Sequence, residues 1–226
     1  MFSHAFAAGA LLGTAISPLV CVSAAERSPV AAAEDVVARV TPSAKGAVLF
    51  HLNPDQGNKI TISGIAGGIR VEASDVRRLV AGYGWYLKNI AKVHFSWNGN
   101  RITLPSPLPV PASPVTVESP WNIVFAYNYC TLSYTAAFWD WNRWQREIDF
   151  LALNGFTHAL VTAGLEKTWE DFLTGLGYPR EKALRFIPNP AFAAWWNMGN
   201  LEGHGGPLSQ QQINKMAQMG RRIVSR

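Results

Sequence analysis

The amino-acid sequence predicts an α/β protein in two units, a small α+β domain followed by the first β/α repeats of a larger parallel sheet. Strand-like and helix-like patterns alternate through residues 25–104, and a proline cluster follows at 105–119. Longer apolar strands then alternate with helical patterns through residues 120–226. Near-continuous apolar strands that alternate with helices are typical of parallel β/α units, whereas short alternating strands are typical of a small mixed sheet.

The composition is that of a core-forming globular protein: 226 residues, 48% hydrophobic and 15% charged. The formal charge of +5 is scattered without a basic stripe, which argues against a nucleic-acid partner. No His, Cys, Asp or Glu cluster has zinc or calcium spacing, and no glycine-rich loop has a phosphate-binding pattern. We therefore expect no metal and no cofactor. The sequence carries no signal for a particular oligomeric state.

Residues 1–24 have the pattern of an export signal. The run 5–20 is uncharged, Val22-Ser23-Ala24 suits signal-peptidase cleavage, and the run is too short for a membrane span. No other segment is long and apolar enough to span a membrane. We expect an exported protein, periplasmic or secreted. A lipid anchor on Cys21 fits less well, because the bulky Val20 stands where a small residue is expected.

Residues 25–104 predict the small α+β domain. Alternating or apolar runs at 48–50, 59–62 and 69–71 indicate three short strands. Ser74 is placed to cap a helix, whose apolar face carries Val76, Val80, Tyr83 and Leu87. Asn98-Gly99 lies between two further strand-like runs and predicts a hairpin with a tight primed turn, since both residues tolerate positive φ.

The segment 105–119 predicts a stiff, extended connector between the two domains. It has prolines at 105, 107, 109, 111 and 114. Proline cannot donate to a β ladder and cannot continue a helix, so this spacing favours an extended chain at a domain boundary.

Residues 120–226 predict at least two β/α units. Runs 122–127 and 156–161 indicate buried strands, and each is followed by a helical pattern. Glycine stops, an Asn189-Pro190 helix start and a Ser209–Gln212 capping box divide the helices. Eight such units close a barrel, and an open sheet has about five or more. The pattern therefore predicts an incomplete parallel sheet.

The helix that begins near Trp139 has two distinct faces. One face is apolar and is expected to lie in the core, and the other is polar and is expected to be solvated, with Asp140 as a cap. The apolar face carries Trp141, Trp144, Ile148 and Leu151, and the polar face Arg143, Arg146, Glu147 and Asp149.

A long, unusual run resembles a known enzyme family. Tyr127-Asn128-Tyr129-Cys130-Thr131-Leu132-Ser133-Tyr134, Trp139-Asp140-Trp141 and Met198-Gly199-Asn200-Leu201 are similar to the start of the catalytic domain of α-N-acetylglucosaminidases, glycoside hydrolase family 89. Gly84-Trp85-Tyr86-Leu87-Lys88 resembles the small N-terminal domain of that family. The resemblance covers nearly the whole chain after the export signal. It implies that residues 120–226 are the first part of a truncated (β/α)8 TIM barrel.

The resemblance also implies a reaction and a substrate. The family removes terminal α-linked N-acetylglucosamine from glycans with retention of configuration, using two glutamates on later barrel strands, so no catalytic residue is expected in this chain. Asn128, Cys130 and Trp195 match family positions that line the sugar pocket. We therefore expect an exo-glycosidase whose N-terminal portion is inactive alone. A non-enzymatic carbohydrate-binding or interaction module is the alternative, and a separate chain that completes the barrel is a third possibility.

Each site residue also has a simpler explanation. Asn128 could be a loop amide bonded to its own backbone, and Cys130 a small hydrophobic residue without a base to activate it. One of Trp195 and Trp196 is expected to be core, and only the family register selects Trp195 for the pocket. Glu166 follows the second strand, where a catalytic acid could lie. Because the family places its acids elsewhere, Glu166 is expected to support the pocket.

Overall fold

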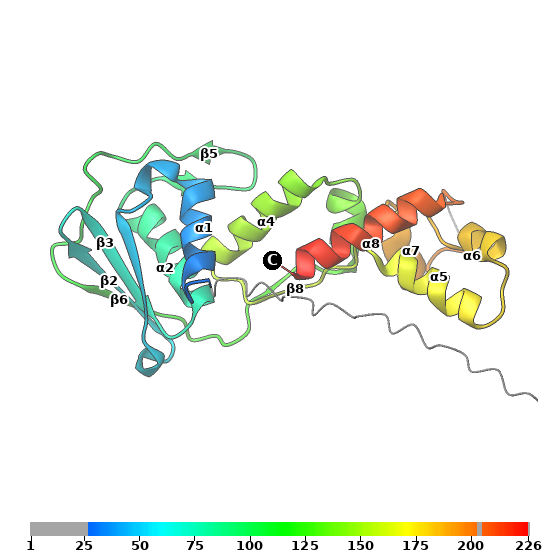
Figure 1. Cartoon of the computed structure of the whole chain (residues 1–226), viewed down its shortest axis with the longest axis horizontal. Helices are drawn as coiled ribbons and strands as arrows, with labels where there is room; N and C mark the ends of the chain where they lie inside the picture. Colours follow the sequence, from blue (N-terminus) through cyan, green and yellow to red (C-terminus); the bar gives the residue numbers. More distant parts are fainter. Residues whose placement is uncertain (1–26, 203–204, 226) are drawn as a thin grey trace, which may run out of the picture.

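The computed structural model of the protein describes residues 27–202 and 205–225. Two units lie end to end along the long axis of the molecule, with helix α4 (Trp141–Leu153) between them (Figure 1). A four-stranded sheet with two helices forms one unit, and a two-stranded parallel sheet with the remaining helices forms the other. The predicted export signal, residues 1–24, lies outside the described residues.

The first unit is built on a mixed sheet in the order β1-β3-β2-β6. β1 pairs with β3 in parallel, and the other neighbours are antiparallel. The strands are β1 (Val48–Leu52), β2 (Lys59–Ile65), β3 (Gly68–Ala73) and β6 (Val115–Glu118), with short 3-10 turns η1 (Pro42–Ala44) and η2 (Pro54–Gln56) between elements. The three strands predicted from alternating apolar residues are confirmed, each a few residues longer than predicted.

Two helices, α1 (Ala31–Val40) and α2 (Val76–Asn89), pack on this sheet and on each other (Figure 1). Ile62 and Ile69 of the sheet are fully buried in one core with Leu79 and Tyr83 of α2. The apolar face predicted for α2 therefore faces the core. No sequence pattern above predicts α1, although its apolar side chains are buried in the same core.

The N-cap of α2 is Asp75, so the prediction of Ser74 is wrong by one residue. The Asp75 Oδ1 accepts a hydrogen bond from the Arg78 backbone N–H at 2.8 Å. The Ser74 hydroxyl instead donates to the Gly57 carbonyl at 2.6 Å. A carboxylate satisfies the free N–H as a hydroxyl would, and its negative charge also suits the positive end of the helix dipole.

The predicted hairpin is present, but its turn is wider than predicted. β4 (His94–Phe95) and β5 (Asn100–Arg101) pair antiparallel. Residues 96–99 form the turn, in which the Ser96 backbone N–H and hydroxyl both donate to the Gly99 carbonyl. Neither residue of the Asn98-Gly99 pair has a positive φ. The primed two-residue turn is therefore wrong, and the wider turn holds Trp97.

The proline-rich segment 105–119 packs against the first unit as well as joining the two units. Its last residues form β6 at the edge of the sheet, where Val117 lies opposite Ile60. The Tyr86 hydroxyl donates to the Pro109 carbonyl at 3.0 Å. The segment expected to be only a connector thus contributes a strand to the sheet.

The second unit alternates strands with helices, as the sequence predicts. Parallel strands β7 (Phe125–Ala126) and β8 (His158–Ala159) form its sheet. Its other elements are α3 (Tyr129–Thr131), the π-helical turn η3 (Leu132–Ala136), α5 (Leu165–Gly175), α6 (Arg180–Phe186), α7 (Ala193–Asn197) and α8 (Gln210–Val224). The strands are less buried than predicted: Ile123 and Phe125 are 65% and 56% exposed. Two strands offer too little sheet for helices to cover both faces.

The helix ends of the second unit follow the sequence in most places. Asp140 caps α4, and Ser209 and Gln212 form the predicted capping box of α8. Gly155 has a φ of +76°, which confirms the stop after α4. The predicted N-cap at Asn189 is wrong, because α7 begins at residue 193. The Asn189 side chain instead accepts from the backbone N–H two residues later, in the turn that precedes the helix.

Candidate functional site

The candidate site begins where β7 ends. Tyr127 follows the strand with a φ of +74°, in the left-handed region that residues with a side chain rarely adopt. Asn128 comes next and caps α3. Polar residues at the carboxyl ends of parallel strands form the active-site face of β/α folds, so this turn lies at the functional end of the sheet.

Asn128 bonds its own backbone and still keeps a free donor. Its Oδ1 accepts from the Thr131 backbone N–H at 3.2 Å, and the Thr131 hydroxyl accepts from the Asn128 backbone N–H at 3.3 Å. The side chain is exposed, and its Nδ2 has no hydrogen-bond partner among the described residues. The simpler explanation of Asn128 therefore accounts for its oxygen, while its two amide hydrogens remain available to a ligand.

Cys130 lies in α3, half-buried and with a free thiol. Within residues 27–202 and 205–225, no hydrogen-bonded base accompanies it, and no group of three or more His, Cys, Asp or Glu side chains could hold a metal ion. A nucleophilic cysteine needs a base or cation that lowers its pKa. The described residues supply no hydrogen-bonded base, so for Cys130 the lining of a sugar pocket remains a prediction.

Ser133 connects this segment to helix α7. The buried Ser133 hydroxyl donates to the Pro190 carbonyl and accepts from the Ala194 backbone N–H, both at 3.0 Å. These two bonds hold α7 against α3 and η3, so Trp195 lies beside the segment that carries Asn128 and Cys130. The structure thus brings the three predicted site residues onto neighbouring elements.

The two adjacent tryptophans have different environments. Trp196 is 9% exposed and packs edge-on against Trp169 and Phe186, with ring centroids 4.7 and 5.2 Å away. Trp195 is only partly buried and packs edge-on against Tyr134, with the ring centroids 4.7 Å apart and the ring planes at 90°. Tyr134 itself is 75% exposed. Trp196 is therefore the core residue of the pair, and Trp195 and Tyr134 form an aromatic surface next to α3.

Glu166 lies in α5 and is buried beside Trp196, away from the aromatic surface formed by Trp195 and Tyr134. It is 3% exposed and lines a cavity of about 10 Å³ with Trp169 and Trp196. Its Oε2 accepts from the Gly164 backbone N–H at 3.1 Å, while its buried Oε1 has no partner among the described residues. Burial raises the pKa of this carboxyl. A cavity of that size holds one water at most, so Glu166 has no room to reach a sugar.

The two acids of the polar face of α4 are buried and its two arginines are half-buried, which corrects the prediction of a solvated face. Glu147 is 1% exposed and pairs with Arg143 at 2.8 Å. Its carboxylate also accepts from the Trp97 indole N–H at 2.7–2.8 Å and from the Tyr127 hydroxyl. Burial, together with the hydrogen bond to Glu147, raises the pKa of Tyr127 well above its ordinary value.

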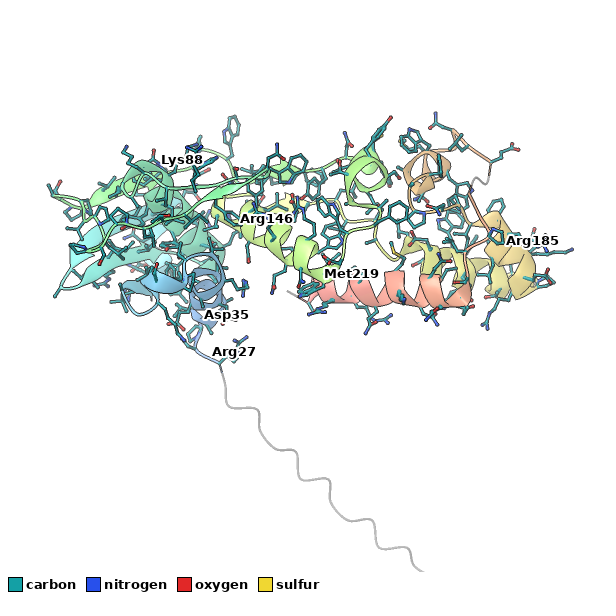
Figure 2. The ribbon with its side chains drawn as sticks, turned by 90° about the horizontal axis from the view of Figure 1, so that it is seen from above. Arg27, Asp35, Lys88, Arg146, Arg185 and Met219 are labelled. Carbon is teal, nitrogen blue, oxygen red and sulfur yellow. The ribbon has the colours of Figure 1, made fainter. Side chains whose placement is uncertain are left out.

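A second buried acid of α4 fastens the two units together. Asp149 is 4% exposed and accepts two hydrogen bonds from Arg39 of α1. Arg146 donates to the Ser96 carbonyl, and its guanidinium lies over the Phe95 ring at 4.4 Å. Figure 2 shows Arg146 on the part of α4 that faces the first unit. Glu147 thus forms an ion pair within α4, with Arg143 one turn earlier, whereas Asp149 forms its ion pair between α4 and α1.

Comparison with known proteins identifies the family. The model of the alpha-N-acetylglucosaminidase (NAGLU) N-terminal domain matches residues 31–110, and the model of the tim-barrel domain of the same family matches residues 124–226. The chain belongs to the α-N-acetylglucosaminidase family. Its fold is accordingly the small N-terminal domain and the start of the TIM barrel; the described residues contain no closed barrel.

Individual relatives agree with this assignment. Human alpha-N-acetylglucosaminidase is 37% identical over 161 residues, which is 71% of this chain and 22% of the relative. A family 89 glycoside hydrolase from Clostridium perfringens has a TM-score of 0.80 at 29% identity, over 86% of this chain and 23% of that chain. That structure is a variant with two glutamates changed to glutamine, in complex with its substrate GlcNAc-alpha-1,4-galactose. The same hydrolase in complex with PUGNAc matches equally well, at 30% identity. The chain spans about a fifth of the length of these relatives.

Sequence reasoning missed the residues that support the site. Tyr127, Ser133 and Glu147 act through contacts made with distant parts of the chain. No local spacing reveals such contacts. The one sequence signal is the pair of acids, Glu147 and Asp149, beside two arginines on a helix whose opposite face is apolar.

Proposed function

We propose that this chain is the N-terminal part of an exo-glycosidase that hydrolyses terminal α-linked N-acetylglucosamine from glycans with retention of configuration. In this proposal the chain supplies the small N-terminal domain and the first wall of the sugar pocket. Asn128, Cys130 and Trp195 form that wall. Membership of the α-N-acetylglucosaminidase family supports the reaction, and the substrate complexes of the bacterial relative support the sugar.

One observation carries the proposal: a free amide donor and a partly exposed indole lie on neighbouring elements at the end of β7. The Asn128 Nδ2 is unbonded within the described chain, and Trp195 is held beside α3 through Ser133. Sugars are bound by amides that reach their hydroxyls and by aromatic rings that pack on their apolar faces. Tyr134 extends the aromatic surface.

The chemistry of retention requires two carboxyl groups about 5–5.5 Å apart, one as acid and one as nucleophile. The buried carboxylates described here have other tasks. Glu147, Asp149 and Glu170 are paired with arginines, and Glu166 faces a cavity of about 10 Å³. We therefore assign no catalytic acid or nucleophile to the described residues, and we expect this chain alone to be inactive.

We also propose that the protein is exported, to the periplasm or the medium. The uncharged run 5–20 and the small-residue site that follows support this proposal. Among the described residues, no helix is long and apolar enough to cross a membrane. The test is N-terminal sequencing of protein recovered from a host with a secretion pathway, where a start at residue 25 is expected and an intact Met1 would contradict export.

The pocket is tested by NMR titration of the chain with methyl α-N-acetylglucosaminide and with its β anomer. We expect signals of Asn128 and Trp195 to shift with the α anomer and less with the β anomer. Asn128→Ala and Trp195→Ala should each weaken binding roughly tenfold, the effect of one lost hydrogen bond or stacking contact. Trp121→Ala, at an exposed tryptophan outside the site, is the matched control.

Two outcomes would contradict the proposal. Equal binding of the two anomers would remove the basis for α-specificity, and unchanged binding by both variants would place the sugar elsewhere. A nitrophenyl α-N-acetylglucosaminide assay completes the test, since hydrolysis by this chain alone would contradict the claim that it lacks the catalytic pair.

A further inference from the structure

We infer that Trp97 and Glu147 are positioning residues, through which the small N-terminal domain fixes the orientation of Asn128 in the sugar pocket. The inference rests on the proposed function and assigns a task to the N-terminal domain. It follows from a continuous chain of contacts. The hairpin residue Trp97 bonds Glu147 of α4, Glu147 bonds Tyr127, and Tyr127 directly precedes Asn128.

Glu147 is the centre of this chain of contacts. It is 1% exposed, so its carboxylate must be satisfied by protein groups. Arg143 supplies the opposite charge at 2.8 Å. The Trp97 indole N–H lies 2.8 and 2.7 Å from the two carboxylate oxygens, and the Tyr127 hydroxyl also bonds Oε1. Trp97 and Tyr127 come from separate parts of the chain and Arg143 from the same helix, so the three groups together fix the carboxylate.

Tyr127 links the Glu147 carboxylate to the backbone of Asn128, because it bonds Glu147 and directly precedes Asn128. Its φ of +74° is unfavourable for a residue with a Cβ and persists only where the surroundings determine it. The bond from its phenol to Glu147 is the contact available to hold it. A change of φ at Tyr127 would rotate the chain that follows, and with it the N-cap that aims the Asn128 amide.

The position of Trp97 is determined in turn by the hairpin that carries it and by contacts of that hairpin with α4. The turn 96–99 closes β4 and β5. Arg146 of α4 donates to the Ser96 carbonyl and lies over Phe95, whose ring centroid is 6.4 Å from that of Phe150. The hairpin is thus fastened to α4 through Phe95 and Ser96, the two residues that precede Trp97. The side chains of Trp97, Glu147 and Tyr127 therefore connect the N-terminal domain to the proposed pocket.

Two single-group deletions test this inference in the 226-residue chain. Trp97→Phe removes the indole N–H and keeps a ring, and Tyr127→Phe removes only the phenol hydroxyl. For each we would measure the side-chain amide signal of Asn128 by NMR, the affinity for methyl α-N-acetylglucosaminide, and the melting temperature. Trp121→Phe is the matched control, since Trp121 is 69% exposed and bonds no acid in the described chain.

We expect both variants to shift the Asn128 amide signal and to weaken sugar binding roughly tenfold, because a displaced Asn128 amide loses its hydrogen bond to the sugar. Glu147→Gln, which retains an acceptor oxygen, should weaken binding less than either. A lower melting temperature with an unchanged amide signal and unchanged affinity would overturn the inference and leave the three residues a structural role only. If Trp97→Phe fails to fold, Tyr127→Phe decides the question in the same way.

The amide signal separates this inference from the proposed function. If wild-type protein binds no sugar while the variants still shift the Asn128 amide, the proposed function fails and the positioning stands. If the wild type binds sugar and the variants bind equally well with an unshifted amide, the positioning fails and the proposed function stands.

Discussion

The Arg39 guanidinium holds the Asp149 carboxylate through two hydrogen bonds, Nε to Oδ2 at 2.8 Å and Nη2 to Oδ1 at 2.7 Å. The pair joins α1 to α4 across 110 residues of sequence. The hydrogen bond to Asp149 raises the pKa of Arg39. Because the geometry is bidentate and the acid is buried, this contact differs in kind from a surface ion pair.

Asp149→Asn should destabilise the protein by roughly 2 kcal/mol, less than the value for a fully buried pair because the Arg39 side chain is 24% exposed. The amide keeps the size of the carboxylate but loses one acceptor and the charge. Urea denaturation at pH 7 measures the effect. Arg27→Met breaks the exposed Arg27–Asp35 pair (Figure 2) and should change stability by less than about 0.5 kcal/mol. Equal effects at the two sites would contradict this account.

Gly84→Ala should force α2 and α4 apart. A Cβ at Gly84 would lie 1.8 Å from the Leu153 carbonyl oxygen, which belongs to backbone and cannot rotate away. We expect a loss of roughly 2 kcal/mol or more, measured by thermal unfolding. Gly175→Ala, at a helical glycine with open space around it, should be neutral or stabilising by up to about 1 kcal/mol. An unchanged melting temperature for Gly84→Ala would show that α2 and α4 can separate without loss of stability.

Glu166→Gln should raise the free energy of unfolding, relative to wild type, more at pH 7 than at pH 4. Burial raises the folded-state pKa of Glu166, so the contribution of its neutral form is fully present below the unfolded pKa of about 4.5 and is lost as pH rises through the folded pKa. Glutamine stays neutral throughout. Urea denaturation of both proteins at the two pH values gives the difference in their free energies of unfolding. A difference that does not change with pH would contradict the raised pKa of Glu166.

Tyr83 should make the protein sensitive to alkali. It is fully buried, its hydroxyl lies 2.5 Å from the Thr41 hydroxyl, and burial raises its pKa to about 12. The unfolded chain ionises near pH 10, so the stability that Tyr83 contributes is complete below pH 10 and falls as pH rises toward 12. Between pH 9 and 11.5 wild type should lose roughly 2 kcal/mol more than Tyr83→Phe.

Two controls accompany the alkaline measurement. Tyr178→Phe, at a tyrosine that is 53% exposed, is the control for the loss of a phenol hydroxyl at the surface. The neutral-pH cost of Tyr83→Phe, roughly 1 kcal/mol for a lost buried hydrogen bond, is subtracted first. Parallel profiles for wild type and Tyr83→Phe would rule out this tyrosine as the alkaline-sensitive group.

The elements that follow local rules could be predicted from the sequence, and those that depend on distant contacts could not. The strands at β1, β2 and β3 follow from apolar alternation, and the capping box at Ser209 from two residues three apart. β6 is different. The prolines that precede it suggested a connector, yet Val115–Glu118 pair with the edge of β2. A pairing over that separation leaves no trace in local spacing.

The site shows the same division. The resemblance to the family selected Asn128 and Trp195, and the structure places them on neighbouring elements. The polar face of α4 was expected to meet water because charged residues usually do. Glu147 and Asp149 are buried instead, since Trp97 and Arg39 reach them from the other unit. Only the packing of two units decides whether such a face meets solvent.

Helix α4 belongs to the second unit in sequence but packs against the first unit, and this limits where the protein can be divided into fragments. Leu153 belongs to the same buried cluster as the sheet and α2, so the interior of the first unit is completed by a helix that lies after the proline-rich segment. A fragment ending at residue 119 would open that interior to water. We expect the amides of α4 to exchange hydrogen as slowly as those of β3, as one cooperative folding unit whose boundary falls after residue 153 rather than at the prolines.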